Sequence, residues 1–234
     1  MSRIPTAVAL VLALGGLGVA AGCGEPDDGP TASTPTGPDC QDFDETSDEQ
    51  PVDPGAWCLR AAGAADAPYA VVEVPDGYVS WSGFLKPPGE PSALVSYWTV
   101  ESVYEDPCTR AGGAVDPGPS VQDLADALGR QRITDTTEPV PVTLDGHDGL
   151  YLELTFPAEM DFGPCLEPEL YVWEADDRVG ARWEDILGVV DSYWILDVDG
   201  RRVVLAASRV PQLPESGVAE LKGILESAEF VESA

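Results

Sequence analysis

Hydrophobic and polar side chains alternate along several stretches of the chain, a pattern typical of β-strands with one face on a core. The clearest stretch is 150–156, where Leu or Phe occupies every even position and Tyr151 and Glu153 face the other way. Val140–Leu144 shows the same alternation, and the turn-forming residues 145–149 separate the two stretches. We therefore expect two neighbouring antiparallel strands here.

A β-hairpin is predicted between residues 193 and 207. The stretches 193–198 and 202–207 are rich in β-branched and apolar residues, and Asp199-Gly200 separates them. Asp-Gly favours the positive φ angles of a two-residue hairpin turn. Further strands are expected at Tyr69–Val74, at Ala93–Glu105 as a strand or hairpin arm, and at Glu169–Ala175.

Two segments repeat apolar residues at helical spacing. The first follows Ser120, which forms a capping box with Asp123, and ends near Gly129. Its apolar face comprises Val121, Leu124, Ala125 and Leu128. The second begins at Pro214, and its apolar face comprises Val218, Leu221, Ile224, Leu225 and Ala228.

This order of elements predicts one α+β domain over residues 55–234. In it, an internal helix and a C-terminal helix pack on an antiparallel β-sheet. A chain of 234 residues has room for one domain plus extensions or for two small domains. A hydrophobic content of 44%, with six tryptophans, is enough for a packed core.

Residues 1–22 have the layout of a bacterial signal peptide. A short basic region precedes the uncharged apolar stretch 7–21, and small residues come before Cys23. This arrangement is similar to a lipobox, with Ala20 where such motifs most often have Leu. We expect a lipoprotein whose Cys23 carries acyl chains, palmitate among them, and anchors it to the cell membrane on the extracytoplasmic side. Plain secretion and an uncleaved membrane helix are the alternatives.

Residues 23–54 are predicted to be an acidic, low-complexity tether. Between Gly24 and Pro54 there are ten acidic residues and no basic one. Such a segment buries too little apolar surface to offset its ordering entropy. The whole chain has 12 basic and 42 acidic residues, a formal net charge of −30. This charge argues against nucleic acid and anionic lipid surfaces as partners, and it permits cationic partners.

Four cysteines follow Cys23, and an even number in an exported chain predicts disulfides. Of the three possible pairings, we expect Cys108 with Cys165 across the body of the fold and Cys40 with Cys58. Zinc binding is not indicated, because the chain has no CxxC motif and a single histidine.

Several motifs together resemble a domain of uncharacterised actinobacterial lipoproteins and membrane-anchored extracytoplasmic proteins. The resemblance covers about residues 68–231 and rests on the segments 74–78, 103–108, 152–157, 161–165 and 194–201. The two cysteines of that domain correspond to Cys108 and Cys165, which supports their pairing. The order of elements is also similar to the PsbP-like fold of LpqN-type lipoproteins. The resemblance implies an envelope location and brings neither catalytic residues nor an activity.

Candidate catalytic residues are few. His147 is the only histidine, with Asp145 and Asp148 nearby, but no Gly-x-Ser-x-Gly motif accompanies it. We therefore expect an exposed turn histidine and no Ser-His-Asp triad.

Three of the carboxylate pairs in the sequence are considered as candidate sites. Asp197-x-Asp199-Gly200 is similar to a fragment of a calcium loop, but two arginines follow it, so the hairpin is the favoured interpretation. Asp176-Asp177 and Glu184-Asp185 are expected to be solvated loop charges; as paired acids of a glycosidase they would have to face each other across a cleft.

Aromatic residues on the predicted strands are the most suggestive feature. If they gather on one side of the sheet, they form a binding surface for a glycan, lipid or protein. The alternative, which we favour, is that both sheet faces are covered and the aromatics are buried. The candidate surface residues are Trp98, Tyr104, Tyr151, Trp173, Trp183 and Trp194.

The sequence thus favours a non-catalytic extracytoplasmic module that binds or senses an envelope ligand or partner. A carboxylate-dependent hydrolase of envelope carbohydrate and a structural envelope component are the alternatives. We expect neither an enzyme activity nor a cofactor or metal, and the chain does not reveal its ligand or oligomeric state.

Overall fold

A computed structural model shows how these elements are arranged. The structure describes residues 40–43, 48–61, 64, 67–82, 84–87, 93–174 and 180–232, which belong to one compact unit. The predicted signal peptide, Cys23 and most of the predicted tether lie outside the described residues, as does Asp176-Asp177.

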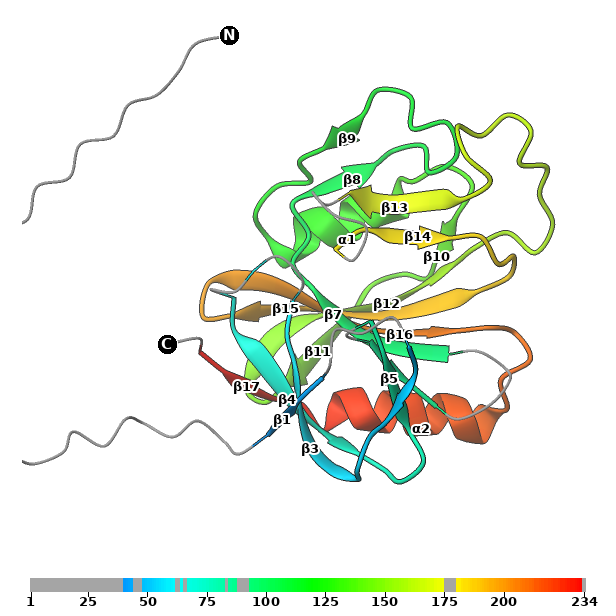
Figure 1. Ribbon diagram of the computed structural model, residues 1–234. Helices are drawn as coiled ribbons and strands as arrows, with labels where there is room; N and C mark the ends of the chain where they lie inside the picture. The colour runs from blue at the N-terminus through cyan, green and yellow to red at the C-terminus, as the bar shows by residue number, and fades with distance from the viewer. Residues whose placement is uncertain are drawn as a thin grey trace, which may run out of the picture. The chain divides into compact units, whose positions relative to one another are not determined.

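A nine-stranded antiparallel sheet forms the middle layer of the described fold (Figure 1). In spatial order its strands are β10 (Asp135–Thr136), β12 (His147–Thr155), β15 (Val190–Val198), β16 (Arg201–Arg209), β7 (Ala93–Trp98), β6 (Phe84–Lys86), β5 (Val79–Trp81) and β2 (Gln50–Pro51), and β11 (Val140–Leu144) also pairs with β12. The predicted hairpin is β15–β16. It turns at Asp199-Gly200, both with positive φ, which confirms the interpretation of this motif.

Two smaller sheets and two helices cover the faces of the central sheet (Figure 1). The lower layer consists of α2 (Glu215–Glu226) and a sheet of β1 (Gln41–Asp42), β3 (Gly55–Leu59), β4 (Tyr69–Val74) and β17 (Glu229–Val231). The upper layer consists of α1 (Val121–Gly129) and a sheet of β14 (Arg182–Glu184), β13 (Leu170–Glu174), β8 (Ser102–Tyr104) and β9 (Ala114–Val115). The predicted α+β class with antiparallel pairing and two packed helices is therefore confirmed.

The core is divided by the central sheet into a lower and an upper cluster. On β15, Trp194 and Leu196 pack into the lower cluster, whereas Tyr193 and Ile195 pack into the upper one. This follows from the period of two along a strand. Because both faces are covered, the central strands are apolar on both sides.

Both helices show the features predicted from the sequence, a capping box in α1 and a buried apolar face in α2. Ser120 Oγ accepts a hydrogen bond from the Asp123 backbone N–H (3.1 Å), and the Asp123 carboxylate accepts one from the Ser120 N–H (2.9 Å). This is the capping box expected from the sequence. On α2, the predicted apolar face buries Leu221, Ile224 and Leu225 in the lower cluster.

Two predicted elements differ in the structure. The stretch Ala93–Glu105 is not one strand, because β7 ends at Trp98 and the chain crosses to the upper layer before β8. The predicted turn 145–149 is limited to Asp145-Gly146, so His147 begins β12. The period-two pattern cannot show that a chain leaves one sheet for another, since alternation continues through the crossing.

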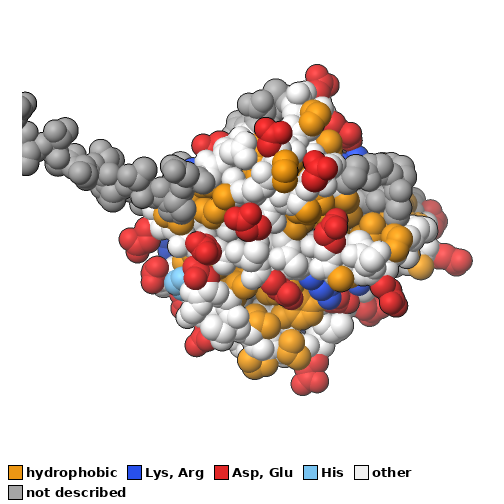
Figure 2. Space-filling model, turned by 90° about the horizontal axis from the view of Figure 1, so that it is seen from below, with side chains coloured by type: hydrophobic (Ala, Val, Ile, Leu, Met, Phe, Trp, Pro, Cys, Tyr) orange, Lys and Arg blue, Asp and Glu red, His pale blue; other side chains and the backbone are white. Residues whose placement is uncertain are grey.

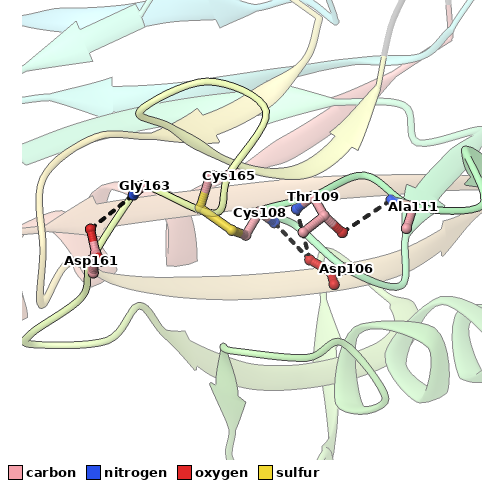
Figure 3. The surroundings of a disulfide bond; sticks show 7 residues. All are labelled: Asp106, Cys108, Thr109, Ala111, Asp161, Gly163 and Cys165. Carbon is pink, nitrogen blue, oxygen red and sulfur yellow. Dashed lines mark hydrogen bonds between the residues drawn. A yellow bond between two sulfur atoms is a disulfide. The ribbon is translucent and has the colours of Figure 1, made fainter.

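The Cys108–Cys165 disulfide belongs to the upper layer (Figure 3). It joins the loop after β8 to the loop before β13, and the two Cα atoms are 4.5 Å apart. The Asp106 carboxylate accepts hydrogen bonds from the backbone N–H groups of Cys108 and Thr109 (3.1 and 2.9 Å). This turn fixes the backbone beside the disulfide.

The second expected disulfide, Cys40–Cys58, ties residue 40 to β3 in the lower layer. Residues 41–42 pair with β3, and residues 50–51 pair with β5. The predicted tether boundary at residue 54 is therefore wrong for the described residues 40–43 and 48–54, which belong to the fold. Composition alone predicts a solvated segment here, but strand pairing and a covalent bond hold these residues in place.

Candidate ligand-binding site

The six aromatic residues predicted as a candidate binding surface do not gather on one surface, although two of them, Trp98 and Trp183, line the pocket between the central sheet and β14. Four of them are buried, with Trp98, Tyr104, Trp173 and Trp194 each at most 5% exposed. Tyr151 packs against the lower cluster, and Trp183 packs against a small cluster in the upper layer. The favoured alternative is thus confirmed for the four buried rings, because the two outer layers cover both faces of the sheet that carries or adjoins them.

A pocket of about 570 Å³ lies between the central sheet and β14. Its walls come from β5, β6, β7 and β16 on one side and from β14 and the residues after it on the other. Pockets for small organic ligands have this size. We call this cavity the side pocket.

The side pocket has a buried floor and an exposed rim. Ser96, Trp98, Arg182 and Ser208 are among the buried residues that line it. Its exposed members are Glu49, Trp81, Asp185 and Ile186. An apolar interior with a few polar groups is the usual composition of a ligand site.

A row of aromatic rings leads from the rim into the core. Trp81 is 38% exposed, and its ring centroid lies 6.3 Å from that of Phe84, its partner across β5 and β6. Phe84 is followed by Trp98 at 6.0 Å, and Trp98 contacts the buried Trp173 edge-on at 5.2 Å. These separations are those of favourable aromatic pairs. The row gives one wall of the side pocket a continuous aromatic surface.

Arg182 stands at the floor in a fully occupied ionic network. Its guanidinium binds Asp191 through two hydrogen bonds, Nε to Oδ2 (2.7 Å) and Nη2 to Oδ1 (2.8 Å). Nη2 also binds Glu184 (3.0 Å), and Nη1 donates to the Trp183 carbonyl. The Tyr193 hydroxyl donates to Asp191 Oδ2 (2.5 Å). This network bridges β14 and β15, so it joins the upper layer to the central sheet.

The network changes the acidity of its members. Burial acts to lower the pKa of Arg182, but the charge and hydrogen bonds of Asp191 outweigh it, so this pKa is raised. Burial and the Asp191 charge raise the pKa of Tyr193 well above its ordinary value. Arg182 therefore stays charged and Tyr193 stays neutral at any physiological pH, and neither is poised for proton transfer.

Ser96 provides a polar group in the floor that the fold does not use. Its side chain is 1% exposed, and its Oγ has no hydrogen-bond partner within the described part of the chain. It lines the side pocket on the upper face of β7. A buried hydroxyl without a partner is unfavourable by about 1–3 kcal/mol. A ligand that exchanges a hydrogen bond with Ser96 would remove this penalty.

A second polar cluster lies on the lower face of the central sheet. Lys222 of α2 donates to Tyr151 Oη (2.7 Å) and to Glu153 Oε1 (3.0 Å). Burial acts to raise the pKa of Glu153, but hydrogen bonds from Tyr151 and Lys222 and the charges of Lys222 and Arg209 outweigh it, so this pKa is lowered. The cluster fastens α2 to the sheet, and its lysine has a raised pKa, which is unsuited to a general base.

The other candidate residues have structural partners. Asp145 accepts a hydrogen bond from the Phe230 N–H (2.7 Å), and Asp148 accepts one from the Thr143 hydroxyl (2.8 Å). His147 packs edge-on against Phe230 at 5.4 Å. Asp197 accepts the Gly200 N–H (2.8 Å) within the hairpin turn. These contacts account for the aspartates near His147 without catalysis.

Glu184 and Asp185 differ from the prediction for this pair. Glu184 is half-buried and bound to Arg182, whereas Asp185 is exposed. Both line the side pocket, so they are more than solvated loop charges.

Two further properties concern the described residues only. They contain no group of three or more His, Cys, Asp or Glu side chains arranged to hold a metal ion. Neither α1 nor α2, nor any other helix in this part of the chain, is long and apolar enough to cross a membrane.

Acidic side chains dominate the face of the molecule seen from below (Figure 2). They are scattered between apolar side chains, and basic ones are few there. This agrees with the net charge of −30 of the chain.

A comparison with protein-family models and a comparison with curated proteins each found no match to this chain. The resemblance to lipoprotein domains stays a prediction, and the side pocket is the structural feature that bears on function.

Most residues of the side pocket were missed by sequence reasoning. The strands that carry Trp81, Phe84 and Arg182 have only three residues each, too few for a period-two signal. One signal was present: Asp191 and Ser96 interrupt otherwise apolar strands, and a polar residue in such a position needs a partner.

Proposed function

We propose that this protein is a lipid-anchored, extracytoplasmic binding protein that holds a small, largely apolar ligand in the side pocket without chemical conversion. One observation carries the proposal: a pocket of about 570 Å³ has an aromatic wall and, in its floor, a buried hydroxyl without a partner. Such a pocket gains free energy when an apolar body displaces its water and when a polar group meets Ser96.

A binding role is favoured over a hydrolase by the state of the acids. Of the three acids that line the side pocket, Glu49 is bound to Lys86 and Glu184 to Arg182, so only Asp185 has no ion-pair partner among the described residues. A glycosidase uses two carboxyl groups that face each other across the scissile bond.

The binding role is tested with the uncharged fluorescent probe N-phenyl-1-naphthylamine. We expect saturable binding of one probe per chain. Ser96→Leu, which fills the floor, should weaken binding by at least about tenfold, and Trp81→Ala should weaken it by about five- to tenfold. Leu166→Ala removes an equally apolar, 65% exposed side chain elsewhere and should leave binding unchanged.

Two results would overturn the proposed pocket. One is no saturable binding to the wild-type chain. The other is unaltered binding to Trp81→Ala, a rim variant whose exposed position makes unfolding a poor explanation. Circular dichroism of each variant shows whether the fold is retained.

The membrane anchor is a separate part of the proposal. In an exporting bacterium fed with labelled palmitate, the wild-type chain should incorporate label and Cys23→Ser should not. A labelled Cys23→Ser protein, or a wild-type protein without label, would contradict lipidation at this residue. The two disulfides of the fold fit an exported chain, because such bonds persist outside the reducing cytoplasm.

A further inference from the structure

The side pocket is charged as well as apolar, and its charges constrain the ligand. Three basic side chains line it, and each already has a carboxylate partner. Lys86 binds Glu49 (2.6 Å), Arg182 binds Asp191 and Glu184, and Arg209 lies 3.5 Å from Glu153. An anionic group entering the pocket would therefore find Lys86 and Arg182 occupied, and of Arg209 it would find only Nε without a partner among the described residues.

Three acids and three basic residues line the pocket. Two further carboxylates, Asp191 and Glu153, bind Arg182 and Arg209 from outside the lining, so the surroundings of the pocket are acidic. Glu49 and Asp185 are exposed at the rim, and within the described residues no ion pair involves Asp185. Arg182 is shared by two carboxylates, Asp191 and Glu184. A carboxylate or phosphate at this rim would be repelled, whereas an ammonium group would be attracted.

The aromatic wall also favours a cationic ligand over an anionic one. The faces of Trp and Phe rings carry negative electrostatic potential and attract cations within about 6 Å. The rings of Trp81, Phe84 and Trp98 follow one another at 6.0–6.3 Å with their planes tilted by 39° and 54°, so they present both faces and edges to an apolar body in the pocket. Ser96 adds an uncharged hydroxyl that can donate or accept one hydrogen bond.

We infer that the side pocket selects ring-containing ligands that are cationic or uncharged and excludes anionic ones. The ring body lies along Trp81, Phe84 and Trp98, and an ammonium group, when present, lies at the rim near Asp185. This inference rests on the proposed function, because it names the ligand class of the same pocket.

The test uses three ligands with one body: 2-naphthylmethylamine, 2-naphthalenemethanol and 2-naphthoate. Their dissociation constants are measured by tryptophan fluorescence on the full chain in lipid nanodiscs, with empty nanodiscs as the blank. At low salt we expect the amine to bind about tenfold or more tightly than the carboxylate, with the alcohol between them. The difference should shrink at 0.5 M salt, because exposed rim charges are screened.

A charge variant and a matched control locate the effect. Asp185→Asn should reduce the preference for the amine over the carboxylate about threefold or more and leave the affinity for the alcohol unchanged. Asp199→Asn removes the same charge from the hairpin turn, where Asn tolerates the positive φ, and should leave all three affinities unchanged.

The outcomes separate this inference from the proposed function. If the naphthyl compounds and N-phenyl-1-naphthylamine all fail to bind, the proposed function is wrong. If the alcohol binds and the carboxylate binds as tightly as the amine or more tightly, the pocket is real and the charge selection is wrong. If Asp185→Asn and Asp199→Asn reduce the preference for the amine equally, the charge selection by the pocket is also wrong, since only the overall charge of the protein would then matter.

Discussion

Each face of the central sheet carries a trio of a tyrosine, a carboxylate and a basic side chain, and the two trios differ in their exposure to water. On the upper face Tyr193, Asp191 and an arginine of β14 are joined, and on the lower face Tyr151, Glu153 and a lysine of α2 are joined. The side chains of the upper ion pair are 8% and 0% exposed, whereas those of the lower pair are 29% and 24% exposed. The lower trio keeps access to water, and the upper one does not.

The difference in burial determines how much the loss of a charged partner destabilises each face. Half-exposed ion pairs contribute little, because water solvates the charges almost as well as the partner does. A fully buried pair becomes costly when one member is lost, because the other charge stays without solvent. The upper network is thus a rigid support beside the side pocket, and the lower cluster is a replaceable fastening of α2.

The largest expected effect is at Arg182. Arg182→Leu leaves the Asp191 carboxylate buried without its partner and should destabilise the protein by about 3–5 kcal/mol, measured by urea unfolding. Arg182→Leu combined with Asp191→Leu should recover a substantial part of this loss, because no buried charge is left. A loss below about 1 kcal/mol in the single variant would show that the two faces do not differ as described.

Removing each disulfide in turn compares the stability that the two bonds contribute in the upper and lower layers. Replacing Cys108 and Cys165 by Ser opens a loop with a sequence separation of 57 and should cost about 4 kcal/mol. The same exchange at Cys40 and Cys58, with a separation of 18, should cost about 3 kcal/mol. Unfolding in urea under non-reducing conditions measures both. An inverted order would indicate that the shorter loop restrains more of the fold than loop length predicts.

The lower trio should tolerate the loss of its cation. Lys222→Met keeps much of the apolar stem and should destabilise the protein by less than about 1 kcal/mol. The urea assay used for Arg182→Leu allows the losses of unfolding free energy on the two faces to be compared directly. A loss as large as that of Arg182→Leu would remove the distinction drawn from burial.

Two buried serines on opposite faces provide a smaller test. Ser192 Oγ lies 3.3 Å from both Tyr151 Oη and Glu153 Oε1, whereas Ser96 Oγ has no partner among the described residues. Ser192→Ala should cost about 1 kcal/mol, and Ser96→Ala should be neutral or stabilising by up to about 1 kcal/mol. Thermal unfolding of both variants checks the sign. A destabilising Ser96→Ala would mean that this hydroxyl serves the fold.

The smallest effect concerns acid. The pKa of Glu153 is lowered below its ordinary value of 4.5, so its contribution to stability is complete above pH 4.5 and is lost as the pH falls through the lower, folded value. Glu153→Gln should therefore lose less stability than the wild-type protein between pH 4.5 and pH 2.5, measured by urea midpoints. Parallel curves for the two proteins would contradict this role.

Elements with strong local signals could be predicted from the sequence. The capping box at Ser120, the Asp199-Gly200 hairpin and the apolar face of α2 all depend on contacts within a few residues. The short strands β5, β6 and β14 were not predicted, because three residues are too few to show the period-two pattern of a strand. The tether boundary was wrong for a related reason, since pairing of residues 41–42 with β3 is invisible in composition.

Several properties could be read from the residues alone: the α+β class, the four cysteines available for disulfides, the acidity of the molecule and the two helices. These properties follow from residue type and from local spacing, so they hold before the chain folds. Folding established which aromatics are buried, that Trp81 and Phe84 line a pocket together with β14, and that Ser96 has no partner among the described residues. Those facts depend on contacts between residues distant in the chain, and a linear pattern carries no record of which distant side chains share a cavity.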